Sequence, residues 1–250
     1  MSTLVLLRHG ESTWNQENLF TGWHDVPLSA KGEAEAAEAG RTMAAAELWF
    51  DEVHTSLLVR AIKTANLTLE TLGQSWLPVI RSWRLNERHY GDLQGKNKRQ
   101  TAEQYGDEQT HLWRRSYDIP PPPVAADSPE HPANDPRYRL LAPDVLPATE
   151  CLEDVVARVL PYWYDDVVPR LRDGRSVLVV AHGNSLRALV MHLEGISPAN
   201  IAELNIPTGV PRRYEFATDL TIERAAYLGD QDAIAAAAAA VAAQSKGGPG

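Results

Sequence analysis

The pattern of hydrophobic and polar positions contains two short apolar runs, of which the first leads through Arg8 into His9-Gly10 and the second directly into His182-Gly183. The runs cover residues 4–7 and 177–181 and consist only of aliphatic side chains. Runs of this length indicate strands that are buried on both faces of a parallel sheet. Ligands of open α/β sheets bind beyond the carboxyl ends of such strands. The pattern therefore predicts that His9 and His182 face one another across one site.

Strand and helix signals alternate through the first third of the chain, which is typical of βαβ units. Residues 29–48 are rich in Ala and Glu and predict a helix. Residues 57–72 carry apolar side chains at helical spacing and stop at Gly73, so they predict a second helix. Short apolar runs at 50–55 and 77–80 predict the second and third strands.

The chain is less regular after residue 84. Residues 84–117 are polar and predict partly helical structure, whereas residues 119–147 hold 9 of the 17 prolines. Because proline lacks the N–H group that helices and central strands use, neither element is expected in residues 119–147. We expect an ordered, proline-rich excursion in polyproline geometry that lies over or beside the site.

The alternation resumes after this excursion. The hydroxyl of Thr149 can cap a helix predicted over residues 149–171, in which Pro161 predicts a kink. The remaining elements predicted are a helix at 185–194, ended by Gly195, and closing strands at 212–217 and 221–226.

These elements predict an α/β fold with a mostly parallel central sheet and helices on both faces. A length of 250 residues suits one or two domains, and we expect one catalytic domain over residues 1–230. Residues 231–250 form an Ala/Gly-rich tail. An isolated helix of about 12 residues is marginal in water, so we expect this tail to be mobile.

Composition restricts the classes of partner. The net charge of −9 argues against general binding to nucleic acid or to an anionic membrane, although a local cationic pocket is compatible with it. No apolar run approaches the roughly 20 residues that span a bilayer. The sequence opens on a strand without a signal-like segment, and its single cysteine, Cys151, allows no internal disulfide. We therefore expect a cytoplasmic protein in which Cys151 packs as a small hydrophobic residue.

Paired histidines are compatible with several chemistries, most of which need further motifs. Zinc needs ligands at short spacing, and serine hydrolases of the α/β class need Gly-x-Ser-x-Gly; neither pattern occurs. The only Gly-Lys pair is followed by Asn97, so no P-loop is present. Histidine itself is left as the nucleophile, and no metal is expected. Surface or structural roles are favoured for five others, which lack the strand-end position: His24, His54, His111, His131 and His192.

A neutral imidazole can attack phosphorus and pass the phosphoryl group onward. The transition state spreads negative charge over three oxygens, which cations and amide donors stabilise where no metal does so. A proton must also reach or leave the acceptor oxygen. Glu87 has the most unusual surroundings of the carboxylates, although composition alone does not distinguish it. The candidate donors are Arg8, Asn15, Arg60, Lys98, Arg114 and Arg115.

Five sequence blocks, in order along the chain, carry a specific resemblance. They are Arg-His-Gly-Glu-Ser-Thr-Trp-Asn at 8–15, Phe-Thr-Gly-Trp at 20–23, Glu-Arg-His-Tyr-Gly at 87–91, Trp-Arg-Arg at 113–115 and Ala-His-Gly-Asn-Ser at 181–185. Together they resemble the cofactor-dependent phosphoglycerate mutases of the histidine phosphatase superfamily. The resemblance covers residues 4–215, which is most of the chain.

This resemblance implies a glycolytic enzyme that interconverts 2-phosphoglycerate and 3-phosphoglycerate. His9 would be loaded by 2,3-bisphosphoglycerate as cofactor, pass the phosphoryl group to one hydroxyl of the bound monophosphate and take back the other phosphate. Glu87 would donate and accept the proton, and His182 would stabilise the group in transfer. The residues implied to hold that group are Arg8, Asn15, Arg60 and Asn184. Those implied to bind the rest of the substrate are Ser12, Thr21, Gly22, Tyr90, Lys98, Arg114, Arg115 and Gly183.

Three alternatives stay open beside this mutase. Bisphosphoglycerate mutases tend to carry Gly-Ala and Cys-Ser where this chain has Ser12-Thr13 and Thr21-Gly22, so the resemblance favours the phosphoglycerate mutase. A phosphatase would pass the phosphoryl group from the same histidine to water. A catalytically silent phosphate-binding protein would need only the cations.

Two residues depart from the family pattern. Asp92 and Lys96 stand where relatives more often have apolar side chains, and a solvent-facing Asp92 would have little electrostatic effect. Relatives of this kind are commonly dimers or tetramers, so a homodimer or homotetramer is expected.

Overall fold

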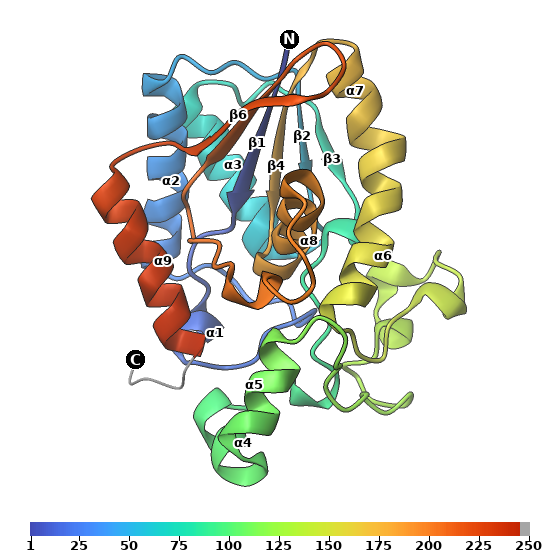
Figure 1. Ribbon diagram of the computed structural model, residues 1–250. Helices are drawn as coiled ribbons and strands as arrows, with labels where there is room; N and C mark the ends of the chain where they lie inside the picture. The colour runs from blue at the N-terminus through green and yellow to red at the C-terminus, as the bar shows by residue number, and fades with distance from the viewer. Residues whose placement is uncertain (246–250) are drawn as a thin grey trace.

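A six-stranded sheet runs through the centre of the molecule, and the computed structural model describes residues 1–245 around it (Figure 1). Its strands are β1 (Ser2–Arg8), β2 (Glu52–Thr55), β3 (Val79–Arg81), β4 (Ser176–Ala181), β5 (Arg212–Phe216) and β6 (Ile222–Tyr227). They lie in the order β3-β2-β4-β1-β5-β6. The first four of that order are parallel, and β5 runs antiparallel to β1 and β6. The predicted mostly parallel sheet is confirmed.

Helices cover both faces of the sheet, as predicted. They are α2 (Ala30–Ala45) and α3 (Val59–Leu72) on one face, and α6 (Leu152–Tyr162), α7 (Val168–Arg172) and α8 (Gly183–Glu194) on the other. Successive side chains of a strand point to opposite faces. Val5 and Leu7 accordingly pack with α2 and α3, while Leu4 and Leu6 pack with α6 and α8.

Two glycines end helices as the sequence predicts. Gly73 follows α3 with φ 75°, and Gly195 follows α8 with φ 64°. Both values lie in the left-handed region, which a residue without Cβ adopts at little cost.

The predicted cap at Thr149 is wrong. The Thr149 hydroxyl donates to the carbonyl of Pro121 at 2.8 Å, so it is not available to a helix. Helix α6 begins three residues later, after Cys151, whose backbone N–H donates to Asp154 at 2.8 Å. The predicted kink at Pro161 takes the form of a π-helical segment, Trp163–Val167, between α6 and α7, because proline offers no N–H to the α-helical pattern.

The proline-rich excursion also differs in part from the expectation. It contains three 3₁₀ turns, Pro132–Asn134, Pro136–Tyr138 and Pro143–Val145, rather than continuous polyproline geometry. Each turn begins at a proline, since the first position of a helical turn uses no N–H. The excursion is anchored by Tyr138, which is 1% exposed and whose hydroxyl accepts a hydrogen bond from Asn86 at 2.8 Å.

The remaining elements surround the carboxyl edge of the parallel strands. They are α1 (Thr13–Gln16), α4 (Lys98–Tyr105), α5 (Asp107–Arg115), α9 (Gln231–Ser245) and short 3₁₀ turns at Trp83–Leu85, Gly91–Leu93 and Ile201–Glu203. Figure 1 shows α4 and α5 beyond the arrowheads of the strands. The mobility expected for residues 231–250 stays a prediction, and residues 246–250 lie outside the described part. None of the helices in residues 1–245 has the length and apolar character needed to cross a membrane.

Candidate active site

The parallel register of the two central strands delivers both histidines to one point. Arg8 at the end of β1 pairs with Ala181 at the end of β4, so the next residue of each strand leaves the sheet at the same level. The rings of His9 and His182 lie 4.9 Å apart between centroids, at 61° to one another. The prediction that they face one another is confirmed.

The protein fixes the tautomer of His9. Its Nδ1 lies 2.6 Å from the carbonyl oxygen of Gly10. A carbonyl only accepts, so Nδ1 of the neutral ring carries the hydrogen and Nε2 keeps its lone pair. Burial, reinforced by the charges of Arg60 and Arg8, holds the pKa of His9 well below its usual value. His9 is therefore neutral at physiological pH, the state that a nucleophile requires.

His182 is fully buried against His9. Its Nε2 lies 2.7 Å from the hydroxyl of Ser56, while Nδ1 has no hydrogen-bond partner in the described part of the chain. Burial, with the charges of Arg60 and His9, holds its pKa well below the usual value. His182 can therefore act as a neutral hydrogen-bond donor to a group attached to His9.

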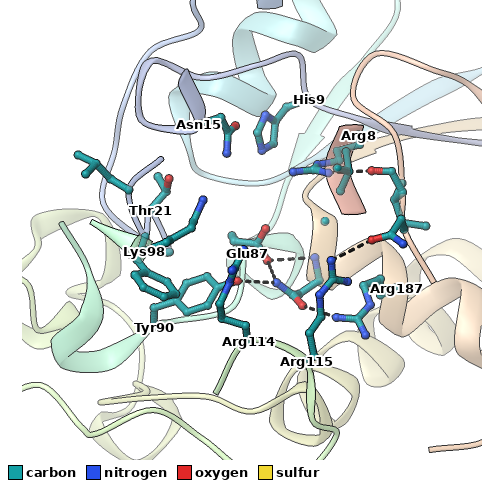
Figure 2. A pocket seen from close by; sticks show the side chains of 18 of the residues that line it. Arg8, His9, Asn15, Thr21, Glu87, Tyr90, Lys98, Arg114, Arg115 and Arg187 are labelled. Atoms are coloured by element: carbon teal, nitrogen blue, oxygen red, sulfur yellow. Dashed lines mark hydrogen bonds between the residues drawn. The ribbon is translucent and has the colours of Figure 1, made fainter. Parts of the chain in front are cut away.

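A pocket opens beside His9 and collects the predicted site residues (Figure 2). Its lining includes Arg8, His9, Asn15, Thr21, Gly22, Arg60, Glu87, Tyr90, Lys98, Arg114, Arg115, Gly183 and Asn184. Two of the predicted residues, His182 and Ser12, do not line it.

Ser12 acts behind the pocket wall. It precedes α1 and is fully buried. Its hydroxyl donates to Asn15 Oδ1 at 2.9 Å, and its backbone N–H donates to the same oxygen at 3.1 Å. These bonds fix the amide of Asn15, so that its NH₂ group remains for an anion in the pocket.

The two carboxylate oxygens of Glu87 differ in their hydrogen bonds. Oε1 accepts from the backbone of Arg88 at 2.7 Å and from the backbone and side chain of Asn184 at 3.0 and 2.9 Å. Oε2 has no hydrogen bond to the described residues. The carboxylate is thus held by one oxygen and offers the other for proton transfer, as a general acid or base requires.

Two arginines lie close enough to His9 for their charges to lower its pKa. Arg8 donates to the carbonyl of Ile206 at 2.7 Å, and its Nε has no partner in the part of the chain that the structure describes. Arg60, at the start of α3, donates to the carbonyls of Gly22 and His24 at 2.7 and 3.0 Å. Burial lowers the pKa of Arg60 to about 10, which still leaves it charged at neutral pH.

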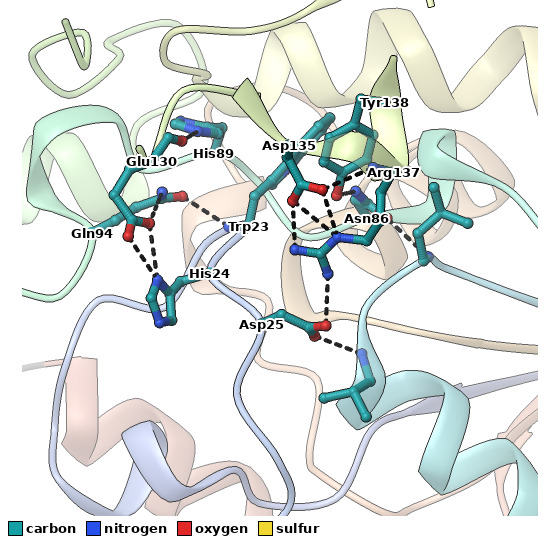
Figure 3. Close-up of polar contacts among 12 residues, drawn as sticks. Trp23, His24, Asp25, Asn86, His89, Gln94, Glu130, Asp135, Arg137 and Tyr138 are labelled. Atoms are coloured by element: carbon teal, nitrogen blue, oxygen red, sulfur yellow. Dashed lines mark hydrogen bonds and ion pairs between the residues drawn. The ribbon is translucent and has the colours of Figure 1, made fainter. Parts of the chain in front are cut away.

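The proline-rich excursion holds the loop to which Arg60 is bonded. Arg137 donates to Asp25 at 2.6 Å and is paired with Asp135, and His24 lies 2.9 Å from a carboxylate oxygen of Glu130 (Figure 3). The excursion therefore contributes to the position of an arginine that lies 59 residues before its first residue in the chain.

The outer wall of the pocket is also cationic. Lys98 opens α4, and Arg114 and Arg115 close α5. Burial, with the nearby charge of Arg114, lowers the pKa of Lys98 to about 7. Arg115 donates to the side chain of Asn205 at 2.9 Å. Cations this close together destabilise one another, and a bound anion would relieve the repulsion.

Sequence reasoning missed several lining residues: Leu19, Phe20, Arg187, Leu204, Asn205, Ile206 and Val241. Arg187 could have been found, because it follows Asn184 by three residues in a predicted helix and three residues return a side chain to the same face. Asn205 and Val241 lie in a loop and in the Ala-rich tail, where no motif marks them.

The residues that depart from the family pattern lie outside the pocket. Asp92 and Lys96 form an ion pair of 2.6 Å, with side chains 56% and 38% exposed. Because they pair locally and face solvent, their effect on the pocket is screened.

The donor set indicates the kind of ligand. Among the described residues, six cationic side chains line the pocket against one carboxylate, and the hydroxyl of Thr21 is buried there without a partner. A small molecule with several phosphate and carboxylate groups fits such a lining. In residues 1–245, no three His, Cys, Asp or Glu side chains gather so as to hold a metal ion.

Comparison with known proteins adds three findings. The profile of the Histidine phosphatase superfamily (branch 1) matches residues 4–220. Two relatives, both described as 2,3-bisphosphoglycerate-dependent phosphoglycerate mutase, come from Thermobifida fusca and Clavibacter sepedonicus. They are 65% and 59% identical, over 88% and 97% of this chain and 90% and 96% of theirs. A solved mycobacterial glucosyl-3-phosphoglycerate phosphatase, in complex with VO3, is 25% identical with a TM-score of 0.67, covering 90% of this chain and 96% of its own.

Proposed function

Because this chain belongs to the histidine phosphatase superfamily, branch 1, we propose that it interconverts 2-phosphoglycerate and 3-phosphoglycerate through a phosphoryl group carried on His9. The observation that carries the proposal is the state of His9. Its Nε2 lone pair is free, its ring is neutral, and it stands against His182 in a pocket lined by cations.

The transfer step uses groups that are already in place. Nε2 of His9 attacks phosphorus, and the charge that develops on the phosphoryl oxygens is stabilised by Arg8, Arg60 and the NH₂ group of Asn15. These donors are held by the backbone and by Ser12, so they need little reorganisation during the reaction.

Glu87 moves the proton. Its Oε2 takes a proton from the hydroxyl that attacks the phosphoryl group on His9, and returns a proton to the oxygen that leaves. Glu87 serves both directions of the interconversion, because the substrate oxygen that gains phosphate and the one that loses it each contact this carboxylate in their own step.

The outer cations bind the rest of the substrate. Lys98, Arg114 and Arg115 lie opposite His9 and suit a carboxylate and a second phosphate. The same set suits the cofactor 2,3-bisphosphoglycerate, which supplies the phosphoryl group that loads His9. This division places chemistry at the strand ends and recognition at α4 and α5.

One experiment tests the function. The protein is incubated with 2,3-bisphosphoglycerate labelled in its phosphates, the labelled residue is mapped, and conversion of 3- to 2-phosphoglycerate is measured beside release of inorganic phosphate. We expect the label on His9 and isomerisation far in excess of phosphate release. Release of phosphate as the main product would assign a phosphatase instead, and anion binding without a labelled histidine would assign a silent binding protein.

Assembly and location follow as further parts of the proposal. We propose a homodimer or homotetramer acting in the cytoplasm, with residues 1–230 as the catalytic domain. The substrates are small phosphorylated acids, so neither nucleic acid nor a membrane is needed as a partner.

A further inference from the structure

Arg187 lies on α8, one turn after Asn184, and is only 5% exposed. Its NH1 donates to Oδ1 of Asn184 at 3.1 Å, and its NH2 donates to the carbonyl of Ile201 at 2.6 Å. Figure 2 shows Arg187 among the side chains that line the pocket. These two bonds fix the plane of the guanidinium group. Burial lowers the pKa of Arg187 to about 9, so it is still a cation at neutral pH.

Stability does not account for this arginine. It forms no ion pair with a carboxylate of residues 1–245. The charges of Arg115 and Arg88 lower its pKa, and the smaller effect of Glu87 raises it. A buried cation whose charge no ion pair offsets costs free energy of folding. Its position in the pocket wall therefore calls for a functional reason.

The bond to Asn184 decides which way the Asn184 amide points. Arg187 can only donate, so it selects the amide oxygen of Asn184 and turns the NH₂ group the other way. That NH₂ group donates to Glu87 Oε1 at 2.9 Å. With the amide reversed, its oxygen would face a carboxylate oxygen, and two acceptors repel one another.

We propose that Arg187 is a positioning residue for proton transfer. By holding the Asn184 amide in one orientation, it keeps Glu87 bound through Oε1 and leaves Oε2 directed at the substrate oxygen. This inference rests on the proposed function, in which Glu87 moves the proton.

The test compares Arg187→Met, which keeps the length of the side chain, with Arg187→Lys, which can still donate to Asn184. At saturating 2,3-bisphosphoglycerate we expect Arg187→Met to lower kcat about 100-fold and to change KM less than about 3-fold, because a misplaced acid-base group costs rate rather than binding. Arg187→Lys should restore kcat to within about 5-fold of the original protein, since one donor to Asn184 is retained. Arg170→Met is the matched control, because Arg170 is bonded to Glu52 away from the pocket.

Two further readouts separate positioning from a general loss of structure. In an Asn184→Ala background, Arg187→Met should lower kcat by less than about 2-fold, because residues that act through one another are not additive. In the ligand-free protein, the side-chain NH₂ signal of Asn184 in the nitrogen-15 NMR spectrum, assigned by its absence from Asn184→Ala, should shift in Arg187→Met and stay unchanged in Arg170→Met.

The outcomes are distinct. An unchanged kcat, additive effects with Asn184→Ala, or a rise in KM alone would overturn the inference, and the last would make Arg187 a substrate clamp. If the original protein neither isomerises phosphoglycerate nor carries phosphate on His9, the proposed function itself fails. An unmoved Asn184 signal in Arg187→Met refutes the positioning role in either case.

Discussion

The inner and outer walls of the pocket are built differently. The inner wall includes His9 and Arg60, which are at most 3% exposed. His9 follows β1 directly and has His182 buried against it, and Arg60 lies at the start of α3. The outer wall, with Lys98 and Arg115, stands on α4 and α5, which bury only Thr101, Thr110 and Trp113. The groups to which we assign chemistry are thus fixed by the core, whereas the groups to which we assign substrate recognition depend on short peripheral helices.

Removal of the His9 imidazole is expected to have the largest effect on activity and tests the role of the inner wall most directly. We expect His9→Ala to reduce mutase activity by about 1,000-fold or more, since it removes the imidazole to which we assign the covalent intermediate. His111→Ala, which removes an exposed histidine of α5, is the control and should retain full activity. Substantial activity of His9→Ala in a folded protein would end the proposal.

The acid-base group should have the next largest effect. We expect Glu87→Gln to lower kcat by about 100-fold to 1,000-fold, because the amide can still accept from Asn184 but cannot take up a proton. KM should stay within about 3-fold, as the cations of the outer wall are untouched. Steady-state kinetics at saturating cofactor measure both, and a change confined to KM would contradict the role of Glu87.

The outer wall should respond to pH where the inner wall does not. The pKa of Lys98 lies at about 7, below its usual value, so Lys98 is charged below that pH and loses its charge as the pH rises through it. We expect kcat/KM to fall several-fold between about pH 6.5 and 8.5 and to fall less in Lys98→Arg, which stays charged.

Lys98→Met, measured at a single pH, tests the contribution of Lys98 to substrate binding separately from its loss of charge with pH. At about pH 6.5 it should raise KM roughly 10-fold with little change in kcat, because it removes a charged contact without moving His9 or Glu87. Identical pH profiles for Lys98→Arg and the original protein would contradict this account of the outer wall.

The smallest effect is expected outside both walls. Asp92→Ala breaks an exposed ion pair with Lys96 and should change the free energy of unfolding by less than about 1 kcal/mol. Chemical denaturation measures this change, and kcat should be unaltered. A clear fall in kcat would mean that the segment after Tyr90 influences the pocket in spite of its exposure.

The inner wall could be predicted from sequence because local signals determine it. Two apolar runs ending in His-Gly define the parallel strand ends, and Gly73 ends α3 by its freedom to take a positive φ. The prediction of a cap at Thr149 failed because the Thr149 hydroxyl donates to the carbonyl of Pro121, which lies 28 residues away in the chain and which no local signal marks.

The outer wall was less predictable for the same reason. Charge made Lys98 and Arg115 candidate donors, but it does not distinguish them from surface residues, and only the family resemblance implied a role in binding the substrate. Val241 reaches the pocket from a tail whose alanines carry no positional information, and the role of Ser12 depends on which oxygen of Asn15 it contacts. Such contacts are decided by tertiary packing.

The parallel pairing of β1 with β4 has a consequence for how such a pocket can vary. Neighbouring strands of any sheet lie about 4.8 Å apart, and the rings of His9 and His182, which follow adjacent strands, are 4.9 Å apart. Backbone hydrogen bonding therefore sets the gap between the two strand ends from which these rings project. Lengthening or shortening the peripheral segments can alter which acid is accepted while this gap stays constant.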